Sequence, residues 1–300
     1  MRELAIPATL PLQPVSTPWL IEAGCELAIL RLDQLDLQVS GNKLFKLQPY
    51  IERMQQQGLR GLISLGGAHS NHLHAMAAAA QRMGITAVGL VRGPAVDSQT
   101  MADVQRWGMQ LHWLSREAYR ARREAHFVED WQRRHPDLQW VPEGGDGALG
   151  QQGAQAIWQV LHASLPALGW VSCDAVVCPV GTGTTWQGVA RLASCPVWGM
   201  SAVPKHYLPP TLRADPCLIL ACRRGFAQSD TALAAFAAEF FAQTGVVLEP
   251  VYTAKALLAL RYQLADGKFA RGSRLVMLHT GGLQGIRATA DWPVSAEVAA

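Results

Sequence analysis

The sequence predicts an α/β fold with two open, mostly parallel sheets in two lobes. Short apolar runs typical of buried strands alternate with segments of helical periodicity, both before residue 142 and after residue 147. This alternation indicates parallel βαβ units. A glycine-rich loop at 142–147 separates the two series. With 300 residues, 49% of them hydrophobic, the chain is long enough for two cores of moderate size.

The first lobe is expected at residues 46–143. A strand at 27–33 and the motif Ser-Gly-Asn-Lys-Leu-Phe-Lys at 40–46 lead into it. Its strands are expected at 62–65, 85–91, 110–114 and 138–141. Its helices are expected at 47–57, 71–83, 99–107 and 117–134.

The second lobe is expected at residues 144–300 together with residues 1–45. If the strand at 27–33 joins its sheet, the first lobe is inserted into the second. The strands of this lobe are expected at 175–179, 197–203, 217–222 and 275–278. Its helices are expected at 151–165, 184–192, 231–244 and 254–264, with a short segment at 246–252 between the last two.

Composition and charge argue against several classes of protein. The densest basic run, at 116–124, contains two glutamates and indicates a solvated helix face, so no nucleic-acid partner is expected. The six cysteines form no C-x-x-C pair, which favours reduced thiols in a cytoplasmic protein. The sequence shows neither a signal-peptide pattern nor an uninterrupted run of about 18 apolar residues, so no membrane partner is expected.

Lysine is scarce, and its placement is informative. Only five of the 26 basic residues are lysines, and two of them, Lys43 and Lys46, stand within four positions. A primary amine can form a Schiff base with a carbonyl, whereas a guanidinium cannot. From spacing alone, both side chains could equally lie on the solvated first turn of a helix.

Three glycine turns follow predicted strands. The loop Val180-Gly181-Thr182-Gly183-Thr184-Thr185-Trp186 opens a helix, and its amides and hydroxyls suit a phosphate, although a purely structural turn stays open. It matches neither a Walker A loop nor the G-x-G-x-x-G fingerprint. The last turn, at 279–285, ends the final strand, where parallel sheets present ligand-binding residues.

The second turn, at 66–72, also lies between a strand and a helix. Its helix-start amides, with Ser70 as a cap, suit a carboxylate, and Asn71 suits a phenolate-like oxygen. The histidines His69, His72 and His74 suggest a metal, but they lack nearby acidic or cysteine ligands. No metal is therefore expected.

Together these motifs resemble the fold-type II pyridoxal phosphate (PLP) enzymes of the tryptophan synthase β superfamily. Within it, the chain resembles the 1-aminocyclopropane-1-carboxylate deaminase and D-cysteine desulfhydrase family, over almost its whole length. The motifs that carry the resemblance are Gly41-Asn42-Lys43, Gly66-Gly67 with Ser70-Asn71-His72, Pro142-Glu143-Gly144-Gly145, the loop 181–185, Glu249-Pro250-Val251-Tyr252-Thr253-Ala254-Lys255, and His279-Thr280-Gly281-Gly282. The resemblance implies two lobes with PLP in the cleft between them, and a homodimer.

The resemblance also implies roles for single residues. Lys43 would link covalently to PLP and act as the catalytic base, and Lys46 would be structural. Ser70, with the amides of Asn71 and His72, would bind the substrate carboxylate, and Asn71 would bond the phenolic oxygen of PLP. Tyr252 would lie near the substrate, as an acid or as a group that positions the nucleophile. The phosphate would be held by Gly181, Thr182, Gly183, Thr184 and Thr185, and the pyridine nitrogen would face Thr253 or Thr280.

Departures from the family pattern favour one reaction. Ring-opening deaminases of the family carry a glutamate where Thr253 stands, a glutamine where His72 stands, and a second tyrosine whose nearest match here is Phe226. A neutral threonine leaves the pyridine nitrogen largely unprotonated, which is adequate for β-elimination but weak for ring opening. Leu44-Phe45 also replaces the usual Thr-Arg pair beside the lysine, so the substrate could differ from either amino acid of the family name. The role of Trp186, in the pocket or in packing, stays open.

We therefore expect a PLP-dependent lyase that performs α,β-elimination on a small amino acid, with D-cysteine as the first candidate, giving pyruvate, ammonia and sulfide. The alternatives are a 1-aminocyclopropane-1-carboxylate deaminase giving 2-oxobutanoate, and a PLP-binding protein without turnover. A Rossmann-type nucleotide binder is disfavoured because the fingerprint is missing.

Overall fold

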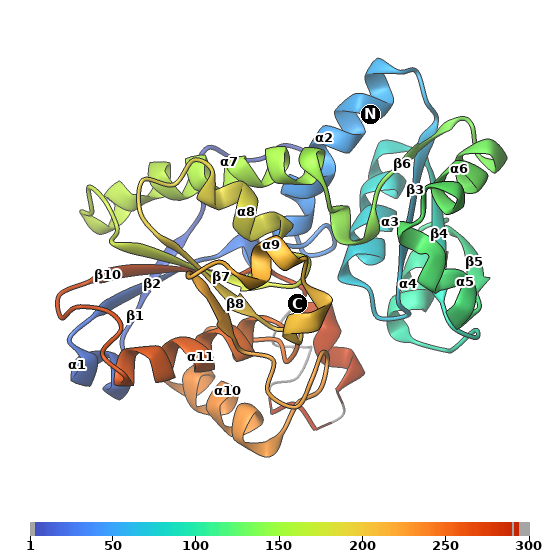
Figure 1. Cartoon of the computed structure of the whole chain (residues 1–300). Coiled ribbons are helices and arrows are strands. Elements are labelled where there is room, and N and C mark those ends of the chain that lie inside the picture. Colours follow the sequence, from blue (N-terminus) through green and yellow to red (C-terminus); the bar gives the residue numbers. More distant parts are fainter. Residues whose placement is uncertain (1–3, 290, 294–300) are drawn as a thin grey trace.

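The computed structural model describes residues 4–289 and 291–293, and contains a large and a small sheet (Figure 1). The large sheet has the strand order β1-β2-β10-β7-β8-β9. Every neighbouring pair in it is parallel except β1 with β2. Its strands are β1 (Leu12–Val15), β2 (Glu26–Leu30), β7 (Ala175–Val180), β8 (Val197–Ser201), β9 (Leu218–Leu220) and β10 (Arg274–Leu278).

The small sheet is entirely parallel, with the order β5-β4-β3-β6. Its strands are β3 (Gly61–Gly66), β4 (Thr86–Arg92), β5 (Gln110–Leu114) and β6 (Leu138–Trp140). The predicted fold class is thus confirmed. Strand β2 pairs with β10, so the large sheet contains strands from both ends of the sequence. The strands of the small sheet, β3–β6, come between them in the sequence. The domain limits at residues 46 and 143 stay a prediction.

Helices cover both faces of the large sheet, with α7 and α8 on one side and α10 and α11 on the other (Figure 1). Alternating strand residues supply the two cores: Val176 and Val276 pack toward α7, whereas Val177 and Met277 pack toward α10 and α11. The α-helices are α1 (Pro18–Ala23), α2 (Asn42–Gln56), α3 (Asn71–Met83), α4 (Gln99–Arg106), α5 (Arg116–Arg120), α6 (Ala125–Arg134), α7 (Ala148–Ser164), α8 (Thr184–Ala190), α9 (Pro210–Arg213), α10 (Thr231–Thr244) and α11 (Thr253–Ala265). The short 3₁₀ turns are η1 (Leu32–Gln34), η2 (Ala121–Arg123), η3 (Glu143–Gly145), η4 (Leu165–Leu168), η5 (Lys205–Tyr207) and η6 (Leu283–Ala288).

Two predicted helices differ most from the structure. The helix expected at 47–57 begins earlier, at Asn42, because Gly41 takes φ +66° and the chain turns directly into α2. The single helix expected at 117–134 is divided into α5, η2 and α6, with extended backbone at Glu124. The break has a visible cause, since Tyr119 and Arg122 both bind Glu143 on the other side of this segment.

The N-terminal strand β1 and helix α1 were not predicted. Proline obscures both of them: β1 contains Pro14 on an edge strand, and Pro18 occupies the first position of α1. Among the described residues, no helix is long and apolar enough to cross a membrane.

Helix α7 packs closely against both α2 and α8 because glycines stand where they cross. A Cβ atom on Gly153 would lie 2.0 Å from the carbonyl oxygen of Phe45 in α2. A Cβ atom on Gly188 would lie 2.5 Å from the carbonyl oxygen of Gln151. The backbone of α7 therefore helps to fix α2, which carries Lys43, relative to α8, which follows the 181–183 loop.

We expect Gly153→Ala to lower the free energy of unfolding by about 2 kcal/mol, because overpacking against the α2 backbone exceeds the helix preference of alanine. Gln159 is exposed on the same helix, so Gln159→Ala is the control and should change the free energy of unfolding by less than about 0.5 kcal/mol. Urea denaturation followed by circular dichroism measures both values. A Gly153→Ala protein as stable as the parent would refute the close-packing argument.

Candidate active site

The predicted site motifs converge where the start of α2 crosses the end of β10. A Cβ atom on Gly41 would lie 2.0 Å from the carbonyl oxygen of Thr280, so only glycine fits there. The amide of Asn42 donates to the same oxygen at 3.2 Å. The hydroxyl of Ser40 accepts a hydrogen bond from the amide of Gly282 at 3.2 Å. These contacts hold Lys43 beside the third glycine turn.

Lys43 is partly buried on the first turn of α2. Its Nζ donates to Oδ1 of Asn42 at 3.2 Å, and Nδ2 of Asn42 donates to Oγ1 of Thr185 at 2.7 Å. Burial lowers the pKa of the Lys43 amine to about 8, while the charge of Glu249 partly opposes this shift. Asn42 thus links the amine to the 181–185 loop, and a fraction of the amine is neutral near physiological pH.

Lys46 lies one helical turn further on and is only 2% exposed. Burial, together with the charge of Lys43, lowers its pKa well below the ordinary value. A Cβ atom on Gly145 would lie 3.3 Å from the Cβ of Lys46, so the 143–145 turn packs directly on this side chain. Lys43 therefore lies on the first turn of α2, whereas Lys46 lies on the second turn and is buried, so the alternative of two solvated first-turn lysines is wrong for Lys46.

The loop at 181–183 forms a backbone cradle. A Cβ atom on Gly183, which has φ +93°, would lie 2.3 Å from the side chain of Leu212. A Cβ atom on Gly181 would lie 3.0 Å from the Tyr252 ring. The early amides of α8, which have no partner within the helix, point toward this cradle. The hydroxyl of Thr184 turns away and donates to Asp146 at 2.5 Å, while Oγ1 of Thr182 bonds Oγ1 of Thr184 at 2.8 Å.

The next residue, Trp186, packs rather than lines the cradle. It is 3% exposed, and its Nε1 donates to the carbonyl oxygen of Val197 at 2.7 Å. A Cβ atom on Gly199 would lie 2.8 Å from its ring. The structure thus assigns Trp186 to the contact between α8 and β8.

Ser70 caps α3, as predicted. Its Oγ accepts a hydrogen bond from the amide of Leu73 at 3.2 Å. Asn71 joins this helix start to the third turn, because its Oδ1 accepts from Nε2 of Gln284 at 2.9 Å. Its Nδ2 faces Gly282, where an added Cβ atom would lie 2.4 Å away.

The three histidines of this segment point to different places. His72 is buried beside the two lysines; its Nε2 bonds Oγ of Ser64 at 2.8 Å, and its Nδ1 has no hydrogen-bond partner among the described residues. Burial, with the charges of Lys43 and Lys46, lowers the pKa of His72 well below its usual range, so the ring is neutral. His74 instead contacts Asp103 and Trp107, and His69 is exposed.

Glu249 organises the start of α11, and sequence reasoning gave it no role. Its buried carboxylate accepts hydrogen bonds from the amides of Val251, Tyr252 and Thr253 at 2.5–2.8 Å. Oγ1 of Thr253 accepts from the amide of Glu249 at 2.9 Å and donates to its carbonyl oxygen at 3.3 Å. The hydroxyl of Thr253 is therefore used within this cap. The only signal in the sequence is the Glu-x-x-x-Thr spacing before a predicted helix.

Tyr252 stands between the cradle and an exposed loop. Its ring lies over Gly181 and meets the Phe226 ring edge-on, with centroids 6.0 Å apart. Burial raises the pKa of the Tyr252 hydroxyl, and the charges of Glu249 and Glu143 add to this effect. Tyr252 therefore keeps its proton at physiological pH. Phe45, by contrast, is fully buried in the core beneath α2 and does not face the site.

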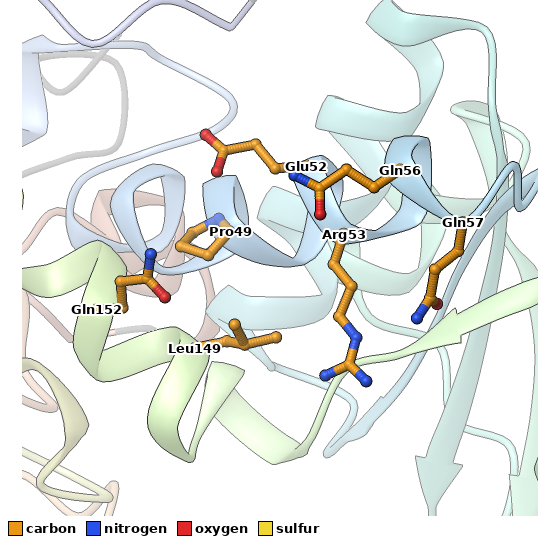
Figure 2. Close-up of a pocket in the computed structure, with 7 residues that line it drawn as sticks. All are labelled: Pro49, Glu52, Arg53, Gln56, Gln57, Leu149 and Gln152. Carbon is orange, nitrogen blue, oxygen red and sulfur yellow. The ribbon is translucent and has the colours of Figure 1, made fainter.

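Two cavities lie away from the cradle. A polar groove of about 260 Å³ runs between the C-terminal half of α2 and the start of α7 (Figure 2). Figure 2 shows Pro49, Glu52, Arg53 and Gln56 of α2, Gln57 just after it, and Leu149 and Gln152 of α7, none of which is a predicted site residue. A second cavity of about 280 Å³ lies behind Ser40 and Gln284 and is lined by Asp33, His74, Asp103 and Arg287 among others.

Comparison with known proteins shows the family and the fold of the chain. A family model described as "Pyridoxal-phosphate dependent enzyme" matches residues 11–281. The chain is 26% identical to the mitochondrial bifunctional D-cysteine desulfhydrase/1-aminocyclopropane-1-carboxylate deaminase of Arabidopsis thaliana, over 88% of this chain and 74% of that protein. It is also 26% identical to the D-cysteine desulfhydrase of Serratia proteamaculans (strain 568), over 86% of this chain and 87% of that protein.

Solved structures show the same fold. The structure of an ACC deaminase homologue aligns with a TM-score of 0.78 and 22% identity, covering 94% of this chain and 92% of that one. A fungal L-serine ammonia-lyase from Rhizomucor miehei aligns with a TM-score of 0.64 and 19% identity, covering 92% of this chain and 93% of that one. Because the family model spans nearly the whole sequence, the chain belongs to the family of pyridoxal-phosphate dependent enzymes.

Proposed function

We propose that this protein is a PLP-dependent lyase that performs α,β-elimination on a small amino acid, D-cysteine in the first instance. The overall reaction adds one water and gives pyruvate, ammonia and hydrogen sulfide. The observation that carries the proposal is the position of Lys43: its partly neutral amine is linked through Asn42 to the glycine cradle that precedes α8, and it lies near the start of α3.

The residues present fit the cofactor. The cradle at 181–183 admits no added Cβ atom at Gly183, and it offers the amides at the start of α8 to a phosphate. The buried Nδ1 of His72 lacks a protein partner close to the two lysines, which is expected of a group that faces a ligand. When bound, PLP supplies the carbonyl that condenses with amines and the ring that accepts electrons.

Lys43 and Tyr252 are assigned opposite proton-transfer roles. The neutral Nζ of Lys43 acts first as the nucleophile and then takes the proton from Cα of the substrate. The Tyr252 hydroxyl, which stays protonated, donates its proton to the departing sulfur. Ser70, with the amides of Asn71 and His72, holds the substrate carboxylate at the start of α3. Nδ2 of Asn71 would donate to the phenolic oxygen of the cofactor when it is bound.

Of the two threonines considered for the pyridine nitrogen, we assign Thr280. The Thr253 hydroxyl is already bonded to the backbone of Glu249, and the Glu249 carboxylate is bonded to three amides. Neither group is then free to protonate a ring nitrogen. A neutral partner there supports elimination with a good leaving group over opening of a cyclopropane ring.

The first test is the visible spectrum of the purified protein before and after D-cysteine, with pyruvate measured in the same cuvette. We expect an enzyme-bound PLP band that shifts as pyruvate appears. We expect Lys43→Ala to lose about 10³-fold in turnover and to lack the lysine-dependent band. The exposed Lys205→Ala is the matched control and should behave like the parent.

Each contrary result has a defined meaning. Full turnover by Lys43→Ala would refute the role of Lys43. A bound-cofactor band with no response to D-cysteine would refute that substrate. Formation of 2-oxobutanoate from 1-aminocyclopropane-1-carboxylate would favour the deaminase instead, and inertness toward D- and L-amino acids alike would favour a PLP-binding protein without turnover.

A second test follows from the lowered pKa of Lys43. Because only the neutral amine reacts with a carbonyl, the rate at which cofactor-free protein binds PLP should rise with pH and reach half its maximum near pH 8. Nα-acetyl-lysine with PLP is the control, and its half-maximum should lie near about 10.4, the ordinary lysine pKa. Absorbance change after rapid mixing gives both rates. A protein half-maximum that coincides with the control would show that burial does not activate Lys43.

We also propose that the protein acts in the cytoplasm as a homodimer. Six cysteines without a C-x-x-C pair support a reducing compartment. Light scattering of the PLP-bound protein should then give twice the 32.5 kDa of the chain. A mass equal to that of one chain would contradict the dimer.

A further inference from the structure

Two cysteines face each other at the base of the large sheet. The Sγ atoms of Cys173 and Cys195 are 3.7 Å apart, and each residue lies in the loop that leads into a strand, β7 and β8 respectively. The amide of Val176 donates to the carbonyl oxygen of Pro196 at 2.9 Å, so the backbone itself holds the two loops side by side. We call these two residues the cysteine pair.

The segment between the two cysteines in the sequence contains the elements that form the cradle. Between its members lie β7, the glycine cradle at 181–183 and helix α8. The cradle follows the carboxyl end of β7, whereas the pair lies at the amino end. At about 3.3 Å per strand residue the two are roughly 20 Å apart. A bond within the pair would therefore close a loop around the cradle without touching the reacting atoms.

The two thiols differ in access and in acidity. Cys195 is partly exposed and stands between exposed Ser194 and Pro196, while Cys173 is 6% exposed. The hydrogen bond between the two thiols lowers the pKa of Cys195 and, with burial, raises the pKa of Cys173. Asp174 opposes thiolate formation at both positions. Cys195 is thus the thiol that meets a solvent-borne oxidant first.

We propose that Cys173 and Cys195 form a reversible disulfide with a hydroperoxide as oxidant, and that this bond slows cofactor release. The Cys195 thiolate attacks a peroxide oxygen, breaks the O–O bond and becomes a sulfenic acid. The Cys173 thiol then attacks the Cys195 sulfur, and water leaves. With hydrogen peroxide, two thiols lose two electrons and two protons, and one peroxide becomes two waters. This inference rests on family membership and not on the proposed substrate.

The physical reason for slower release is the closed loop. The cradle lies between β7 and α8, and a covalent link between the segments that precede β7 and β8 would reduce the number of conformations in which these elements move apart. Reduction by a dithiol should reverse the effect.

The test compares reduced and peroxide-treated PLP-bound protein. In the parent, we expect peroxide to remove two of the six thiols and to yield a Cys173–Cys195 linked peptide by mass spectrometry, with cleavage before Asp174 separating Cys173 from Cys178. We expect PLP release into a scavenger to slow by about threefold or more after oxidation, and to recover with dithiothreitol. Cys173→Ser and Cys195→Ser should show neither effect, whereas the control Cys217→Ser should behave like the parent.

Three outcomes would overturn the proposal. One is a linkage to another cysteine or to a second chain. Another is over-oxidation of Cys195 in the parent without any link to Cys173. The last is a linked protein that releases PLP as fast as the reduced one. Because the readouts are peptide mass and cofactor release, a wrong substrate assignment leaves the test unaffected.

Discussion

The site depends on one backbone crossing, in which two glycines bring the start of α2 onto the end of β10. An added Cβ atom on Gly41 would lie 2.0 Å from the Thr280 carbonyl oxygen, and one on Gly281 would lie 2.4 Å from Oγ of Ser40. Both glycines have positive φ, at +66° and +74°. Any side chain at either position would separate the two segments, so this contact places Lys43 at the carboxyl edge of the large sheet.

The position of Lys43 also determines which charged groups lie around the site. Two amines lie within four residues, with Lys43 partly buried and Lys46 buried, and the neighbouring His72 is held neutral. The carboxylates close to them are already engaged, since Glu249 binds three amides and Asp146 accepts from Thr184. A site with buried amines, free helix-start amides and engaged carboxylates attracts anions. That is the electrostatic character expected for a ligand that carries a phosphate and a substrate that carries a carboxylate.

Local signals predicted the elements that depend on local physics. The bounds of α3 and α10 agree with expectation because Ser70 and Asp230 cap them through their own side chains. The early start of α2 and the break before α6 depend on contacts with distant residues, Thr280 in one case and Glu143 in the other, which no local pattern contains. The same distinction holds for the site. Its turns were visible in the sequence, but the use of the Thr253 hydroxyl by Glu249 appears only in three dimensions.

The two walls of the site are built differently, and this difference bears on selectivity. Regular strand ends and helix starts form the side proposed to hold the cofactor. The side beyond Tyr252 is the 222–228 loop, where Arg223 and Ala227 both take positive φ, an arrangement that costs about 1–2 kcal/mol for each such residue. Two contacts stabilise this loop and offset that cost. Nζ of the buried Lys255 donates to the Gly225 carbonyl oxygen at 2.7 Å, and Arg223 forms an ion pair with Asp230. Lys255 stands one helical turn after Tyr252, so the same start of α11 fixes both the proposed acid and the loop that carries Phe226. If Tyr252 is the proposed acid, a change in this loop or in its anchors would alter the surroundings of that acid without altering the strand ends and helix starts on the other side.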